Sequence, residues 1–407
     1  MGRMVKGLAL SAIASSVVMA GGYKIPEQSL NSMALGAAYV AHTTGADTAY
    51  FNPANMSFMD ADKSYVEGGL TLAHLPSNKY TLIAPYSGES EEENLPIPFL
   101  HYVAPAMGDF RWGVSLTVPG GLTKRWHNQP QKSFAEEFTL KVIEFSPSVS
   151  YKLMDNLSIG GGLRLIYSEG VVKNDATDTG TPFKVDMEGD TIEFGYNLAM
   201  TYKPTDDINI AATYRSNIDL DEDGTATITY PLPTDPPSGI TISGDAGVSV
   251  PLPAALNLAI SKTWNNTFTL EAVYERTYWS EYKTLEFTNT NLRISPKNWK
   301  DTDTFRFGAT IKMENKITAM MGFAIDETPV PVERLGFELP DSDAKIFSMG
   351  FRYQQSENLS WGAAFLYDSK ESFSVPAGVN TNPVLQYGGG FSEGGAFLTT
   401  IGVAYEY

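Results

Sequence analysis

The sequence predicts an all-β protein: a fourteen-stranded antiparallel transmembrane β-barrel, preceded by a small N-terminal helical hatch. Three observations predict this class. Segments in which apolar residues alternate with small or polar ones recur from about residue 63 to the C-terminus. The connections between these segments are alternately short and long. The chain also begins with an export signal, and no later stretch is long and apolar enough to be a membrane helix.

The first element is the export signal, residues 1–20. Arg3 and Lys6 give a positively charged start, and the thirteen residues from Gly7 to Met19 carry no charge. Small residues around Ala20 fit a cleavage site, and the apolar stretch is too short for a membrane anchor. We therefore expect residues 1–20 to be a secretory signal peptide and the mature chain to begin at Gly21.

The second element is residues 21–62, which lack the alternation of a strand. Short helical stretches are expected around 29–38 and 47–50, interrupted by Pro26 and Pro53. The segment is too short to be a domain of its own, and its apolar content is too high for a solvated linker. Because a fourteen-stranded barrel is wide enough to need a plug or to leave a pore, we expect this segment to fill the lumen as a hatch.

The third element is the barrel, residues 63–407. In the segment 156–172, leucines and isoleucines alternate with small residues and Arg164. Because the chain is exported and its basic residues lie on the glycine-rich face, we expect the apolar face to contact lipid and the lumen to hold Arg164, Arg306 and Lys312. A soluble eight-stranded barrel is too small for this chain. The candidate strands are 63–75, 94–105, 110–118, 138–153, 156–172, 190–203, 207–219, 248–264, 267–279, 301–313, 315–326, 343–354, 358–368 and 395–407.

The composition excludes several function classes. Lys and Arg number 29 against 47 Asp and Glu, a net charge of −18, so the protein repels phosphate backbones and no nucleic-acid partner is expected. The absence of cysteine excludes disulfides, thiolate metal sites and cysteine nucleophiles. Four scattered histidines and the absence of a phosphate-binding GxxxxGK[ST] motif predict no metal, no cofactor and no enzymatic activity. A barrel hydrolase is the alternative, but no compact motif gathers a nucleophile with a base.

The chain also resembles a known family. Residues 21–60 contain Asn52-Pro53-Ala54 and look like the N-terminal hatch of the FadL family of outer-membrane transporters. Five later segments match in order: 192–218, 252–260, 275–287, 299–310 and 325–353. The resemblance covers the mature chain. It implies a monomeric barrel in the Gram-negative outer membrane, inserted by the barrel-assembly machinery, surrounded by lipid and lipopolysaccharide, and transporting long-chain fatty acids or, in some members, aromatic hydrocarbons.

The resemblance also implies roles for particular residues. Tyr23 and Ile25 match hatch residues that reach the central ligand pocket, and Lys300 matches a lysine near the fatty-acid carboxylate. Pro119-Gly120-Gly121 matches an inward kink of the third strand that opens the wall sideways. The alternatives are plain hatch packing, a solvated lysine, and an ordinary strand end. Asn52, Pro53 and Ala54 are expected to fix a turn of the hatch.

Two departures from the family pattern bear on the outer surface. The loops 119–137 and 173–189 are short, which puts an external capture groove in doubt, and Lys345 stands where the family usually has arginine. The acidic runs 91–93 and 219–223 are expected to be solvated tips, the alternative being a cation bridge to lipopolysaccharide.

The sequence therefore predicts passive uptake of long-chain fatty acids or similar hydrophobic molecules. Burying each methylene stabilises a ligand by about 0.8 kcal/mol, so roughly fifteen of them approach 12 kcal/mol. Such a ligand leaves slowly unless the pocket rearranges, and a mobile hatch provides the rearrangement. The alternatives are an aromatic-hydrocarbon channel of the same family and a general diffusion porin, which needs an open polar lumen and no apolar hatch.

Overall fold

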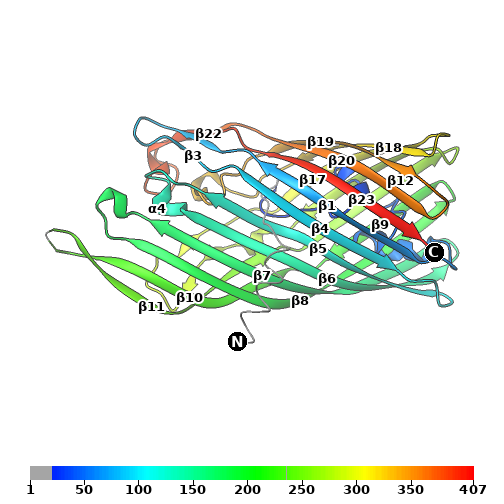
Figure 1. Ribbon diagram of the computed structural model, residues 1–407, viewed down its shortest axis with the longest axis horizontal. Coiled ribbons are helices and arrows are strands. Elements are labelled where there is room, and N and C mark those ends of the chain that lie inside the picture. Colours follow the sequence, from blue (N-terminus) through cyan, green and yellow to red (C-terminus); the bar gives the residue numbers. More distant parts are fainter. Residues whose placement is uncertain (1–20, 235) are drawn as a thin grey trace.

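The computed structural model describes residues 21–234 and 236–407, and the predicted signal peptide lies outside the described residues. Figure 1 shows tilted strands that form one elongated barrel, with the hatch inside its wall. The first strand pairs with the last, β1 with β23, and also with β4, both antiparallel. This pairing closes the sheet and removes its edges, as a membrane-spanning sheet requires.

Fourteen strands cross the wall, as predicted. Two of them are each divided along their length into two consecutive strands, β9 with β10 and β11 with β12. The crossing strands are β1 (Tyr65–Leu75), β4 (Glu93–Val103), β5 (Phe110–Arg125), β6 (Glu137–Met154), β7 (Leu157–Asp175), β8 (Lys184–Thr205), β9 (Ile208–Arg215) with β10 (Ile218–Leu232), β11 (Ser238–Leu252) with β12 (Ala255–Trp264), β13 (Phe268–Thr277), β17 (Thr302–Lys312), β18 (Ile317–Asp326), β19 (Ala344–Gln354), β20 (Leu359–Lys370) and β23 (Ala396–Glu406).

The remaining elements are short. The hatch contains α2 (Leu30–Ala34), α3 (Thr48–Phe51) and η1 (Pro53–Phe58). A small sheet joins β2 (Lys79–Thr81), β3 (Gly88–Glu89), β21 (Phe373–Val375) and β22 (Gly389–Ser392). The other pieces are α4 (Lys132–Ala135), η2 (Thr177–Thr179), η3 (Trp279–Glu281), β14 (Thr284–Leu285), β15 (Phe287–Thr288), β16 (Ser295–Pro296), η4 (Val332–Arg334) and η5 (Leu385–Tyr387). Within the described ranges, no helix is long and apolar enough to cross a membrane.

The two faces of the wall have opposite chemistry. Large apolar side chains such as Phe194, Leu198 and Phe307 are exposed on the outside, the first of them 71%. Arg164 and Arg306 point inward and are buried, as predicted, whereas Lys312 at the end of β17 is exposed. Lipid therefore contacts the outer face, because a soluble barrel would bury its large apolar side chains instead.

The predicted strand ends were wrong on the side of the long loops. The third strand, expected to stop at residue 118, continues through Pro119 to Arg125. The seventh and eighth strands extend to residue 232 and start at residue 238. In these extensions the outward residues are polar, for example Asp221 and Asp223, because the strands stand clear of lipid. The apolar alternation that marks a strand is therefore missing there.

Candidate functional site

The first residues of the hatch lie along the kinked part of β5. The backbone N–H of Gly121 donates to the carbonyl of Tyr23 (2.9 Å), and the N–H of Ile25 donates to the carbonyl of Pro119 (2.8 Å). The side chain of Gln28 donates to the carbonyl of Val118 and accepts from its N–H, both at 2.8 Å. The start of the hatch therefore acts as a short partner strand for β5.

This partner is needed because β4 and β5 separate. They pair only between Leu100–Val103 and Gly113–Leu116, and the rest of β4 pairs with β1 alone. On its other side β5 shifts its register against β6 between Thr117 and Gly120. The predicted Pro119-Gly120-Gly121 segment thus lies within a strand, at a bulge, beside a stretch without β4 pairing. A Cβ atom at Gly120 would approach the Tyr23 carbonyl to 3.1 Å, so glycine lets the hatch come close.

Inward glycines on other strands also let the hatch backbone lie directly on the wall. A Cβ atom at Gly322 of β18 would lie 2.1 Å from the backbone carbon of Leu35. At Gly160 of β7 it would lie 2.5 Å from the backbone nitrogen of Ala54. These separations are far below any real carbon contact. The wall has therefore no room for a side chain at these positions while the hatch is in place.

Charged side chains hold the middle of the hatch. The carboxylate of Glu271 on β13 accepts the backbone N–H groups of Val40 and Ala41 at 2.6 Å and of His42 at 3.0 Å. On β19, Arg352 donates to Asn31 of the hatch and forms an ion pair with Glu67 at 3.0 Å. Hydrogen bonds to charged groups are stronger than those between neutral groups, so both contacts anchor the hatch to the wall.

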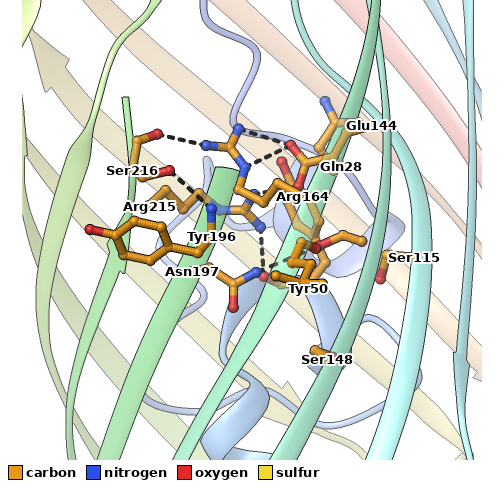
Figure 2. A network of polar contacts seen from close by, with 12 residues as sticks. Gln28, Tyr50, Ser115, Glu144, Ser148, Arg164, Tyr196, Asn197, Arg215 and Ser216 are labelled. Atoms are coloured by element: carbon orange, nitrogen blue, oxygen red, sulfur yellow. Dashed lines mark hydrogen bonds and ion pairs between the residues drawn. The ribbon is translucent and has the colours of Figure 1, made fainter. Parts of the chain in front are cut away.

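A further ionic cluster lies beside the hatch on β6, β7 and β9, and Figure 2 shows its arrangement. The buried carboxylate of Glu144 accepts from Arg164 at 2.9 Å and from Arg215 at 2.9 Å. The Arg215 guanidinium lies 3.8 Å from the ring centroid of Tyr50 and donates to its carbonyl at 2.8 Å. Arg164 also donates to the carbonyl of Ser216 at 2.9 Å.

The Asn52-Pro53-Ala54 motif forms a turn that fastens the hatch. The Asn52 side chain donates to the Val40 carbonyl (2.8 Å) and to the Thr201 hydroxyl (2.9 Å), and it accepts from the N–H of Ala54 (3.2 Å). Pro53 begins η1, where the missing N–H is no loss. The Ser158 hydroxyl donates to the Ala54 carbonyl at 2.7 Å. The motif thus joins two parts of the hatch to β7 and β8.

An apolar cavity of about 20 Å³, called here the outer cavity, is lined by Tyr23. The ring of Tyr23 packs edge-on against Trp279 (4.8 Å between centroids) and contacts Trp299 at 5.7 Å. Its hydroxyl donates to the Pro251 carbonyl at 2.5 Å. Lys297 lines this cavity as an ion pair with Glu338, 2.5 Å apart, and its side chain is 6% exposed. The other lining residues are Leu122, Phe138, Leu140, Val250, Tyr282, Val330, Arg334, Gly336 and Leu339.

A second cavity of about 80 Å³, called here the inner cavity, lies on the other side of the same hatch residues. Ile25, Phe51 and Leu252 give it an apolar part, and Lys24 pairs there with Glu275 at 2.7 Å. Arg164, Arg215 and Arg306 complete its polar part. Tyr23 lines the outer cavity and Ile25 the inner one, so the strand-like start of the hatch separates the two.

Lys300 lies outside both cavities. It is exposed, and its backbone N–H donates to the Pro329 carbonyl at 3.0 Å. Lys297, three residues earlier, is the lysine that reaches the outer cavity. A sequence signal for it existed, because Lys297 and Trp299 are two residues apart and share one face of an extended segment. Lys345 is exposed and pairs with Glu371 at 3.1 Å, away from the cavities.

The family model "Outer membrane protein transport protein (OMPP1/FadL/TodX)" matches residues 11–407. The chain belongs to this family. It is 24% identical to the long-chain fatty acid transport protein of Salmonella typhi, over 79% of this chain and 81% of that protein. It is 23% identical to outer membrane protein P1 of Haemophilus influenzae, over 78% and 80%. Family membership and the barrel together place the chain in the outer membrane.

Two solved structures show the same fold. A Pseudomonas aeruginosa FadL homologue superposes with a TM-score of 0.78 at 19% identity, covering 95% of this chain and 99% of that one. The Pseudomonas putida toluene transporter TodX superposes with a TM-score of 0.73 at 18% identity, covering 94% and 98%. At these identities the likeness concerns the fold alone, and it confirms the barrel predicted from the sequence.

Proposed function

We propose that the protein is a passive uptake channel for hydrophobic molecules, with long-chain fatty acids as the first substrate class. A ligand enters the outer cavity above Tyr23, passes the strand-like start of the hatch, and leaves beside the kink of β5. One observation carries this proposal: the hydrogen bonds of residues 23–28 both close the wall beside β5 and separate the two cavities. A single movement of this segment therefore joins the cavities and opens the wall.

The energies of the two states are comparable, as a passive channel requires. Six hydrogen bonds join Tyr23, Ile25 and Gln28 to the wall, and at about 1 kcal/mol each they contribute roughly 6 kcal/mol. Burying seven methylenes contributes roughly 5–6 kcal/mol. A chain of that length or longer therefore offsets the displacement of the hatch. Since the outer cavity of about 20 Å³ is too small for such a chain, binding and displacement are coupled.

A second candidate substrate class is neutral aromatic hydrocarbons. The rings of Tyr23, Tyr282 and Trp299 line the outer cavity, and Lys297 is neutralised there by Glu338. A carboxylate that enters has to compete with Glu338, whereas a neutral ring does not.

Arg334 lines the same cavity, is half-buried and forms no ion pair among the described residues, so it offers a carboxylate a more accessible cation than Lys297 does.

The relatives and the fold support transport of hydrophobic molecules but leave the substrate open, since the names of the proteins compared include both a fatty-acid transporter and toluene transporters. A monomeric state, insertion by the barrel-assembly machinery, and a lipopolysaccharide environment remain predictions.

The test is uptake by liposomes that contain the mature protein, with oleate, toluene and a small sugar as probes. Binding is followed in parallel by quenching of tryptophan fluorescence, because Trp279 and Trp299 line or adjoin the cavity. We expect saturable uptake of at least one hydrophobic probe and exclusion of the sugar. Free passage of the sugar without hydrophobic uptake would overturn the proposal and leave a general porin.

A further inference from the structure

We propose a second lateral opening in the barrel wall, between β8 and the divided strand β9–β10, through which hydrophobic cargo passes from the inner cavity into the membrane. This inference rests on the proposed function, because it concerns the release route of the same cargo. It is separate from the opening beside β5, which lies three strands away along the sheet.

The ladder of paired residues is interrupted at this place. β8 pairs with β9 as far as Asn197 with Arg215, and pairing resumes only at Asp190 with Asp223. Six residues of β8 (191–196) and seven of the neighbouring strand (216–222) lie between these pairs. On its other edge the same part of β8 is paired continuously with β7. The interruption is therefore a seam between two strands rather than a disordered region.

The seam is held at one end by side chains. The Ser216 N–H donates to the Tyr196 carbonyl, and the Ser216 hydroxyl accepts from the Tyr196 N–H, both at 3.0 Å. Arg164 donates to the Ser216 carbonyl from inside the barrel, as Figure 2 shows. Beside β5 the hatch supplies the missing bonds, but no hydrogen bond between the hatch and residues 191–196 or 216–222 is present in the described chain. Ser216 is thus a latch: its hydrogen bonds join the two strands at the end of the seam next to β9, and the rest of the seam is unpaired.

The seam lies at the depth of the lipid. The outward side chains of this part of β8, Ile192 and Phe194, are 59% and 71% exposed, as expected for lipid contact. Farther along the same face, Glu188 and Asp190 are exposed and mark the border with the polar outer layer. Unpaired backbone in lipid is costly, so closed barrels normally pair every strand at this depth. An interruption here has the position that release into the outer leaflet requires.

The inner side of the seam is apolar at Ile218 and Leu220, holds the buried carboxyl of Glu222 beyond them, and adjoins the inner cavity. Ile166, Ile218 and Leu220 are buried in the same cluster as Tyr23 and Leu252. Leu252 lines the inner cavity, together with Arg164. A Cβ atom at Gly195 would lie 2.5 Å from the Cδ1 atom of Ile218, so this glycine keeps the wall thin where the two strands separate. Apolar side chains thus run from the cavity to the lipid, and the Arg164–Ser216 contact lies between them.

A disulfide across the seam tests the proposal, since the chain has no cysteine of its own. A Cβ atom at position 195 lies 2.7 Å from the Ser216 hydroxyl oxygen, which suits the double variant Gly195→Cys with Ser216→Cys. We expect oxidation to reduce liposome uptake at least twofold and reduction by dithiothreitol to restore it. The matched control is Thr263→Cys with Thr269→Cys, whose side chains face each other 2.9 Å apart on the continuously paired β12 and β13. Its uptake should not change.

Unchanged uptake after complete cross-linking across the seam would overturn the second opening while leaving the proposed function intact. Absence of uptake in the unmodified protein would instead refute the proposed function. Where the cysteine variant does not fold, Ser216→Ala provides the test: it removes the hydroxyl that accepts from Tyr196. Loss of this latch should raise the uptake rate at least twofold, and an unchanged rate in the folded variant would overturn the proposal.

Discussion

Replacing Gln28 by alanine should loosen the closure beside β5 and leave the barrel intact. The buried amide of Gln28 makes both of the side-chain hydrogen bonds that reach Val118, one to its carbonyl and one from its N–H, each 2.8 Å long. At about 1 kcal/mol for each bond, the closed arrangement loses roughly 2 kcal/mol relative to the displaced hatch, where water solvates the amide. Because 1.4 kcal/mol is a factor of ten, the displaced population should rise about thirtyfold.

Hydrogen exchange of the Val118, Gly120 and Gly121 amides measures this population directly. We expect their exchange to accelerate by about tenfold or more in Gln28→Ala, and the uptake of a hydrophobic probe to accelerate with it. The control is Gln354→Ala, whose half-buried side chain donates to the carbonyls of Ser356 and Glu357 in a turn away from β5. Unchanged exchange in a folded Gln28→Ala protein would refute the idea that these bonds close the wall.

Two further substitutions test other parts of the site. Gly322→Val should displace the hatch, since a Cβ atom there meets the backbone of Leu35 at 2.1 Å. The variant should then admit small sugars in a liposome-swelling assay. The control variant Gly244→Val should not admit them, because a Cβ atom at position 244 meets nothing within 4 Å. Glu338→Gln removes the partner of Lys297, so oleate should bind about three- to tenfold more tightly by tryptophan quenching while toluene binding stays constant. Tighter binding of both probes alike would contradict a role for the charge.

The sequence predicted the barrel well where lipid and lumen impose alternating chemistry. Arg164, Arg306 and Lys312 were assigned to the lumen because they lie on the glycine-rich face; both arginines are buried inside, whereas Lys312 is exposed. A hatch over residues 21–62 was inferred from lost alternation, and its role as a plug stays a prediction, supported by the contacts of its backbone with the inward Gly160 and Gly322. Where strands extend beyond the membrane this contrast disappears, and the predicted ends of the third, seventh and eighth strands were therefore wrong.

The site depends on register, which a single sequence does not contain. Glu271 meets the N–H groups of Val40 and Ala41 across about 230 residues of chain, and no local pattern announces that contact. The seam beside Ser216 was equally hidden, because residues 216–217 continue a strand-like stretch. Lys300 was proposed from the family resemblance alone, and only the fold shows that Lys297 reaches the cavity instead.

The glycines beneath the hatch have an evolutionary consequence. On β18, Met321 is 59% exposed to lipid, whereas its neighbour Gly322 touches the hatch backbone. Lipid adapts its shape to any apolar side chain, so the outer position is free to drift among them. The inner position is not, since any added atom must be matched by a change in the hatch some 290 residues earlier in the chain. Hatch and inner wall therefore have to evolve as one unit, while the outer wall of the same strands varies independently.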